Sequence, residues 1–60
     1  MLPQHDHPLT RTYILGARAA TTEAMRNALE IIRAIEQGLD QTTVAQCKLA
    51  AEVLIERRMA

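Results

Sequence analysis

Residues 36–46 read EQGLDQTTVAQ and decide the fold, because they place a glycine and an aspartate between two long segments with helical spacing of apolar residues. Gly38 suits the left-handed conformation that often follows the last turn of a helix, and Leu39 can fold back onto that turn. Asp40 is a favourable N-cap residue for a second helix. The stretch therefore predicts one helix that ends at about residue 37 and another that begins at about residue 41.

The first predicted helix spans residues 22–37. Its apolar residues recur three or four positions apart, which is the spacing of one helix face: Met25, Leu29, Ile32 and Ile35. Thr21 or Thr22 can cap its start, and Glu23 lies in the first turn, where the helix dipole favours an anion. These signals predict an amphipathic helix.

The second predicted helix spans residues 41–58 and carries two apolar stripes. The first stripe contains Val44, Cys47, Ala51 and Leu54, and the second contains Ala45, Leu49 and Val53. A connection of about two residues would make the two helices antiparallel. With lengths of roughly 24 and 27 Å, we expect them to pair from end to end as a hairpin.

The residues before this hairpin form a predicted N-terminal arm. Residues 1–8 contain two prolines and no apolar period, so we expect them to be flexible. Residues 9–20, LTRTYILGARAA, fit either a short helix or an extended segment, which would pack Tyr13, Ile14 and Leu15 against the hairpin. Residues 9–60 are then a single helical domain.

A chain of 60 residues rarely forms a core that contributes more than a few kcal/mol without disulfides, metals or partners. In an isolated hairpin the second stripe of residues 41–58 would face water. We therefore predict a homodimer, an all-α four-helix bundle in which Ala45, Ala50 and Ala51 let the helices approach closely. The predicted core and dimer residues are Met25, Leu29, Ile32, Ile35, Leu39, Val44, Cys47, Leu49, Ala51, Val53 and Leu54.

Charge and aromatic content bear on the partner. Seven Lys and Arg residues balance seven Asp and Glu residues, and the chain has one tyrosine and neither phenylalanine nor tryptophan. Nucleic-acid binders usually carry a basic face, because phosphate contacts supply most of their non-specific affinity. A protein partner fits this chain better than nucleic acid, which remains the alternative. Arg11, Tyr13 and Arg18 of the arm are the predicted partner contacts.

No residue pattern predicts a catalytic, cofactor or metal site. His5 and His7 form an HxH pair, but a flexible terminus supplies no further fixed ligand. Cys47 lies in an apolar stripe and lacks a positioned base, so we expect a buried thiol. Glu52 and Glu56 continue a row with Lys48, which is typical of a solvated helix face. The chain is predicted to be a non-enzyme.

Cysteine content and hydropathy indicate the compartment. A single cysteine cannot form an intrachain disulfide, and no apolar run approaches the roughly 20 residues that span a bilayer. No basic segment followed by an apolar segment marks a secretory signal. We expect a cytoplasmic protein with no membrane partner.

Two DNA-binding patterns match in part. Ala34, Gly38, Leu39, Val44 and Cys47 resemble the spacing of a helix-turn-helix, although Arg33 and Gln37 stand where that motif has apolar residues. The segment RTYIL followed by two helices resembles ribbon-helix-helix repressors, which would make Arg11 and Tyr13 the DNA contacts. The gap from residue 15 to residue 22 is longer than the strand-to-helix step of that family.

The two helices also resemble helix pairs of bacteriophage proteins such as small terminase subunits. The matching residues are Ala28, Leu29, Ile32, Ala50, Ala51, Leu54 and Arg57 or Arg58. This resemblance implies an origin in a phage or mobile element without naming an activity. The two-striped second helix, the neutral charge and the missing catalytic groups favour a small homodimeric modulator or assembly component that binds another protein. The alternative is a small dimeric DNA-binding repressor.

Overall fold

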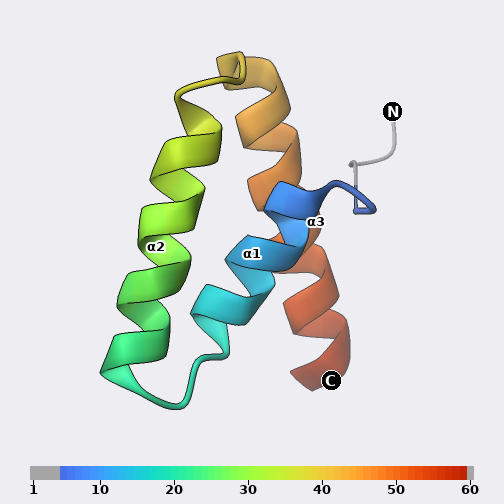
Figure 1. Cartoon of the computed structure of the whole chain (residues 1–60). Helices are drawn as coiled ribbons and strands as arrows, with labels where there is room; N and C mark the ends of the chain where they lie inside the picture. Colours follow the sequence, from blue (N-terminus) through green and yellow to red (C-terminus); the bar gives the residue numbers. More distant parts are fainter. Residues whose placement is uncertain (1–4, 60) are drawn as a thin grey trace.

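Three helices form the part of the chain that the computed structural model describes, residues 5–59. Helix α1 spans Pro8–Ala17, α2 spans Thr22–Glu36 and α3 spans Gln41–Met59. Figure 1 shows α1 lying between the other two helices, with the 37–40 corner at one end. Residues 5–59 contain no strand, so the prediction of an all-α chain is confirmed.

The N-caps of α2 and α3 lie where the sequence predicted them. The hydroxyl of Thr21 accepts a hydrogen bond of 3.1 Å from the backbone N–H of Ala24. A carboxylate oxygen of Asp40 accepts one of 2.7 Å from the N–H of Thr43, which lowers the pKa of Asp40 below its ordinary value. Because each cap satisfies a free N–H of the first turn, both helix starts follow from local sequence.

The corner after α2 differs from the prediction. Gly38 does not have a positive φ, so the predicted left-handed cap is wrong. The N–H of Gly38 donates to the carbonyl of Ile35 at 3.0 Å, and the N–H of Leu39 donates to that of Glu36 at 3.2 Å. These bonds span three residues and tighten the last turn, which satisfies the free carbonyls without a left-handed residue.

The arm is a helix rather than an extended segment. Pro8 occupies its first turn, where a missing N–H costs nothing, and His7 is the N-cap residue. The Nδ1 atom of His7 accepts a hydrogen bond of 3.0 Å from the N–H of Leu9. The helix therefore starts one residue before the boundary predicted at residue 9. The flexibility predicted for residues 1–4 lies outside the described residues.

Helix α1 makes almost all of the contacts between helices. It packs against both α2 and α3, which barely touch each other. It lies close to α2 at Gly16, where an added Cβ atom would lie 3.2 Å from the Cβ atom of Ala28. The predicted end-to-end pairing of α2 with α3 is therefore wrong, because α1 takes the place between them. A symmetric dimer of this chain would contain six helices rather than four.

The core lies where the three helices meet. Its buried residues are Leu9, Ile32, Val44 and Cys47, and Tyr13, Ile35 and Leu39 pack against them partly buried. Thr10, Gly16, Ala28, Ala50 and Ala51 are also buried. Leu9 is completely buried and was not among the predicted core residues, because residues 9–20 fit both a helical and an extended pattern.

The predicted core and dimer residues divide into three groups. Ile32, Val44, Cys47 and Ala51 are buried within the single chain, and Ile35, Leu39, Val53 and Leu54 are partly buried. Met25, Leu29 and Leu49 are exposed, so they do not belong to the core of the single chain. Ala50 and Ala51 were expected at a dimer interface. They are 1% and 3% exposed, which places them inside the chain instead.

The molecule is flat, with principal extents of 34 × 32 × 13 Å. Among the described residues, no helix has the length and apolarity needed to cross a bilayer.

Candidate protein-binding surfaces

Among the side chains that the structure describes, five large apolar ones are exposed: Leu15, Met25, Leu29, Ile31 and Leu49. They come from all three helices, and three of them belong to α2. Single exposed apolar residues are ordinary, but contiguous apolar surface on a small chain marks an interaction site. Open hollows lie beside Leu49 on α3 and between Leu15 and Ile31, and these two regions are the candidate binding surfaces.

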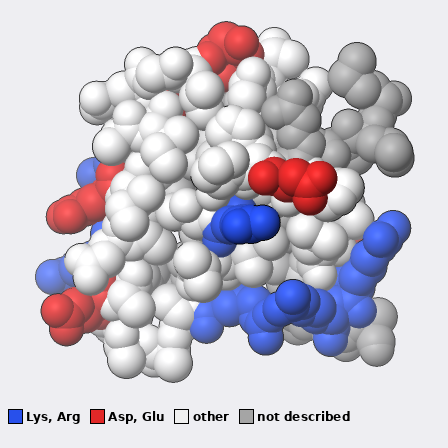
Figure 2. Space-filling model, turned by 45° about the vertical axis from the view of Figure 1, so that its right-hand side comes forward, with Lys and Arg blue, Asp and Glu red and all other residues white. Residues whose placement is uncertain are grey.

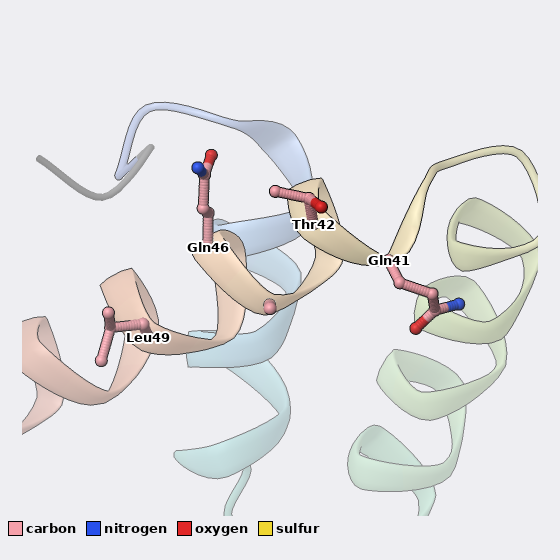
Figure 3. Close-up of a pocket in the computed structure, with 5 residues that line it drawn as sticks. Gln41, Thr42, Gln46 and Leu49 are labelled. Carbon is pink, nitrogen blue, oxygen red and sulfur yellow. The ribbon is translucent and has the colours of Figure 1, made fainter. Parts of the chain in front are cut away.

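The first surface, the α3 outer face, lies on the side of α3 that points away from the core. It is an open hollow of about 420 Å³ lined by Gln41, Thr42, Ala45, Gln46 and Leu49. Figure 3 shows Thr42, Gln46 and Leu49 projecting from successive turns of α3. Val44, Cys47 and Ala51 occupy the opposite, buried side. Ala45 and Leu49 of the second apolar stripe therefore face water in the single chain, as predicted for an isolated hairpin, whereas Val53 is partly buried.

The second surface, the α1–α2 hollow, lies between the end of α1 and the first turns of α2. Its volume is about 460 Å³. Its lining residues are Thr12, Leu15, Arg18, Ala19, Ala24, Asn27, Ala28 and Ile31. Leu15 was expected to pack against the hairpin but is 68% exposed, so that prediction is wrong. Gly16, one residue on, is what faces α2 instead.

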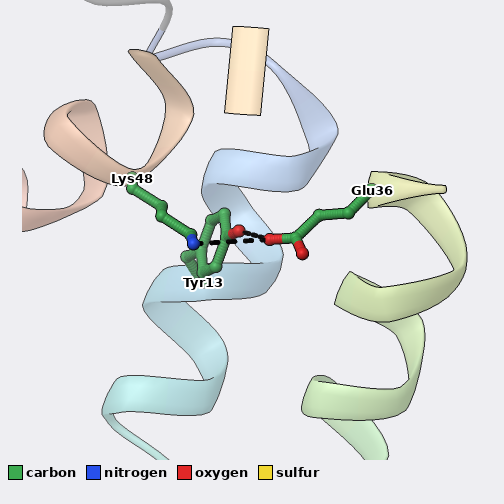
Figure 4. A network of polar contacts seen from close by, with 3 residues as sticks. All are labelled: Tyr13, Glu36 and Lys48. Atoms are coloured by element: carbon green, nitrogen blue, oxygen red, sulfur yellow. Dashed lines mark hydrogen bonds and ion pairs between the residues drawn. The ribbon is translucent and has the colours of Figure 1, made fainter. Parts of the chain in front are cut away.

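Tyr13, which was predicted to contact a partner, is partly buried and makes contacts within the chain. The phenol of Tyr13 donates a hydrogen bond to a carboxylate oxygen of Glu36, and the ammonium of Lys48 lies 5.7 Å from the ring centroid. The same ammonium lies 3.8 Å from Glu36. Figure 4 shows that each of the three side chains comes from a different helix. This network joins α1, α2 and α3, and sequence spacing alone could not have identified it.

The other predicted contacts are also exposed: Arg11 on α1, and Arg18, the C-cap residue that follows it. They stand seven residues apart, about two helical turns, with Leu15 between them in the chain. Figure 2 shows Lys and Arg side chains gathered along the lower edge of the molecule, the level at which α3 ends in Figure 1. Arg57 and Arg58 lie in that last turn of α3.

The residues considered for metal or catalytic chemistry have other surroundings. His5 pairs with Asp6 at 3.4 Å, while His7 caps α1. Cys47 is a free thiol that is completely buried. Glu52 and Glu56 are exposed on α3. Within residues 5–59, no three His, Cys, Asp or Glu side chains lie close enough to hold a metal ion.

The structure also bears on the two DNA-binding resemblances. Residues 11–15, the proposed ribbon strand, belong to α1, so the strand assignment is wrong. Tyr13 is engaged with Glu36 and Lys48 rather than free to contact DNA. The α2–α3 pair barely touches, whereas a helix-turn-helix packs its two helices together.

Comparison with known proteins gives no relative from which a function could be transferred. No protein-family model, curated protein or solved structure matches the chain. The resemblances to small terminase subunits and to DNA-binding repressors therefore stay predictions from individual residues. The α3 outer face and the α1–α2 hollow are the features that can indicate a function.

Proposed function

We propose that this chain is a small non-enzymatic protein that forms a homodimer through the α3 outer face and binds another protein as a modulator or assembly component. One observation carries the proposal: Leu49 is 52% exposed beside Ala45 on the side of α3 opposite the core. A second copy of α3 laid on this face would remove that leucine from water. Burial of apolar surface is the main driving force for such association.

The side chains of the α3 outer face favour an antiparallel pair of α3 helices. When Leu49 lies opposite Leu49 of the second copy, Ala45 lies opposite Val53 of that copy. A small residue then faces a larger one, and the hollow over Ala45 provides room for the valine. Alternation of small and large residues at facing positions is what close helix packing requires.

Charge supports the same orientation. In the antiparallel register, Glu52 lies opposite Gln46, and Glu56 lies opposite Thr42. In a parallel pair, each glutamate would lie beside the same glutamate of the second copy, which is destabilising. The antiparallel pair also places opposite ends of the two helix dipoles together.

Sedimentation equilibrium across a concentration series tests the dimer. We expect a dimer for the unchanged chain and a folded monomer for Leu49→Glu. Leu15→Glu is the matched control, because it introduces the same charge at an exposed leucine of another helix and should leave the dimer intact. A monomer for the unchanged chain at high micromolar concentration, or a dimer of Leu49→Glu, would contradict the proposal.

Oxidative cross-linking tests the register. Leu49→Cys should form a disulfide-linked dimer, because the two cysteines meet at the symmetry axis. Gln41→Cys should not, because the antiparallel register separates the two copies of residue 41 by about 24 Å along the helix. The unchanged chain is the background control, since Cys47 is completely buried. Cross-linking of Gln41→Cys would indicate a parallel pair instead.

A DNA-binding repressor is the second candidate, supported by the exposed Arg11 and Arg18 and by the exposed Gln41 and Thr42 at the start of α3. Glutamine and threonine side chains at the start of a helix can contact base edges in the major groove. Fluorescence anisotropy with labelled duplex DNA tests this candidate. Salt-dependent binding that disappears in Arg11→Ala/Arg18→Ala would support it, and absence of binding at low salt would exclude it.

A further inference from the structure

The α1–α2 hollow combines an apolar floor with a basic margin. Leu15 and Ile31 are 68% and 51% exposed and stand on its two sides, and Ala24 and Ala28 form part of its floor. A hollow of about 460 Å³ has room for one or two large apolar side chains of a partner. It is formed by two helices, so a third helix laid along it would bury apolar surface on both.

Among the residues that line this hollow, the charged one is Arg18, the C-cap residue that follows α1. Arg11 stands seven residues earlier, about 10.5 Å away along the helix axis. Neither guanidinium takes part in an ion pair within residues 5–59, where the acidic partners of the ion pairs are Asp6 and Glu36. The residues that line the hollow include no carboxylate. The guanidinium groups of Arg11 and Arg18 can therefore bind carboxylates of a partner without breaking an ion pair within residues 5–59.

We propose that the α1–α2 hollow binds an acidic amphipathic helix of a partner protein. This inference rests on the proposed protein-binding function and names the chemistry of its partner. Two carboxylates seven residues apart on the partner would match the spacing of Arg11 and Arg18. One or two leucines midway between those carboxylates would enter the hollow beside Leu15 and Ile31. Apolar side chains of an amphipathic helix bind grooves in this way, and charge complementarity sets the orientation.

A second copy of the chain fits the hollow less well than such a partner. The acidic pair Glu23 and Glu30 has the required seven-residue spacing, but Arg26 and Asn27 stand between its members where leucines are needed. Glu52 and Glu56 flank Val53, but they are four residues apart and belong to the helix proposed to form the dimer. The partner is therefore expected to be a different chain.

Fluorescence anisotropy with two designed peptides tests the proposal on the full chain. Both peptides are alanine-based helices of about 18 residues with two adjacent leucines. One has glutamates seven residues apart on either side of the leucines, and the other has lysines at the same positions. We expect the glutamate peptide to bind more tightly than the lysine peptide and its affinity to fall as salt rises.

Variants of the chain locate the binding. Arg11→Ala and Arg18→Ala should each lower the affinity for the glutamate peptide by up to about fivefold, as expected for exposed ion pairs. Leu15→Glu should lower this affinity by at least about tenfold, because the substitution removes the apolar contact and adds a charge that repels the glutamates of the peptide. Leu49→Glu should leave the affinity for the peptide unchanged. Circular dichroism of each variant confirms that it is folded.

Equal affinity for the two peptides, or unchanged affinity in Leu15→Glu and in Arg11→Ala/Arg18→Ala, would overturn the proposal. Binding of duplex DNA but of neither peptide would also overturn it, and would favour the repressor. Peptide binding is measured separately from the dimer. A chain that binds the glutamate peptide as a monomer would support this inference and contradict the proposed dimer. A dimer that does not bind the peptide would support the proposed dimer and contradict this inference.

Discussion

Replacing Leu9 with alanine should destabilise this chain strongly. Leu9 is completely buried, and it lies in the core cluster with Ile32, Val44 and Cys47. The change deletes three buried carbon groups, each with a transfer free energy of about 0.8 kcal/mol. The cavity that remains adds to this loss, so the expected cost is about 3 to 5 kcal/mol.

That cost is large relative to the whole fold. A chain of 60 residues has a free energy of unfolding of about 3 to 9 kcal/mol. Leu9→Ala should therefore lose between about a third and all of the free energy of unfolding. Within residues 5–58 the cluster has four buried residues, so neighbouring side chains offer little that could fill the cavity.

Urea unfolding followed by far-UV circular dichroism measures the effect at one fixed protein concentration. Leu15→Ala is the matched control, because it makes the same change on the same helix at a residue that is 68% exposed. Its free energy of unfolding should stay within about 0.5 kcal/mol of the unchanged chain. A loss below about 1 kcal/mol in Leu9→Ala, or an equal loss in both variants, would refute the placement of α1 between α2 and α3.

Three further changes test local features of the fold. Gly38→Ala should raise the free energy of unfolding by about 0.4 to 1 kcal/mol. Residue 38 has no positive φ, and the new Cβ atom would meet only the carbonyl oxygen of Ile35, at 3.6 Å. A loss of stability in urea unfolding would indicate a left-handed residue instead. The hydrogen bond from Thr43 lowers the pKa of Asp40, so its stabilising contribution is complete above the unfolded pKa and is lost as pH falls through the folded pKa. Thermal melting below about pH 4 should therefore fall more steeply in the unchanged chain than in Asp40→Asn, which caps without titrating, and parallel profiles would argue against this cap. Tyr13→Phe removes the O–H that donates to Glu36 and should cost about 1 kcal/mol in urea unfolding, whereas an unchanged midpoint would show that the network does not stabilise the fold.

The proposed surfaces differ in how far sequence could identify them. The α3 outer face follows from the second apolar stripe, because Ala45, Leu49 and Val53 cannot face the core together with Cys47 on one helix. The α1–α2 hollow could not be predicted in the same way, because Leu15 and Ile31 are sixteen residues apart and meet only through the packing of two helices. The one available signal was Ile31 itself, an apolar residue outside the main stripe of its helix.

Local chemistry in the sequence determined the positions of α2 and α3. Thr21 and Asp40 cap helices through bonds to residues three positions away, and such bonds depend only on neighbouring residues. The apolar stripes also depend on the local sequence, and they predict which side of a helix is buried. They do not predict which helix covers that side. For that reason Ile32, Val44 and Cys47 were predicted correctly as buried, while the helix that covers them was not.

Tertiary structure alone decided the role of α1. In isolation, residues 9–20 satisfy both a helical and an extended pattern, and Gly16 weakens each of them. The helix is retained because Leu9 enters the core, Gly16 allows contact with Ala28, and Tyr13 reaches across to α2 and α3. Each of these contacts depends on residues distant in the chain. The sequence determines where α2 and α3 begin, and packing on both sides of α1 determines how the three helices are arranged.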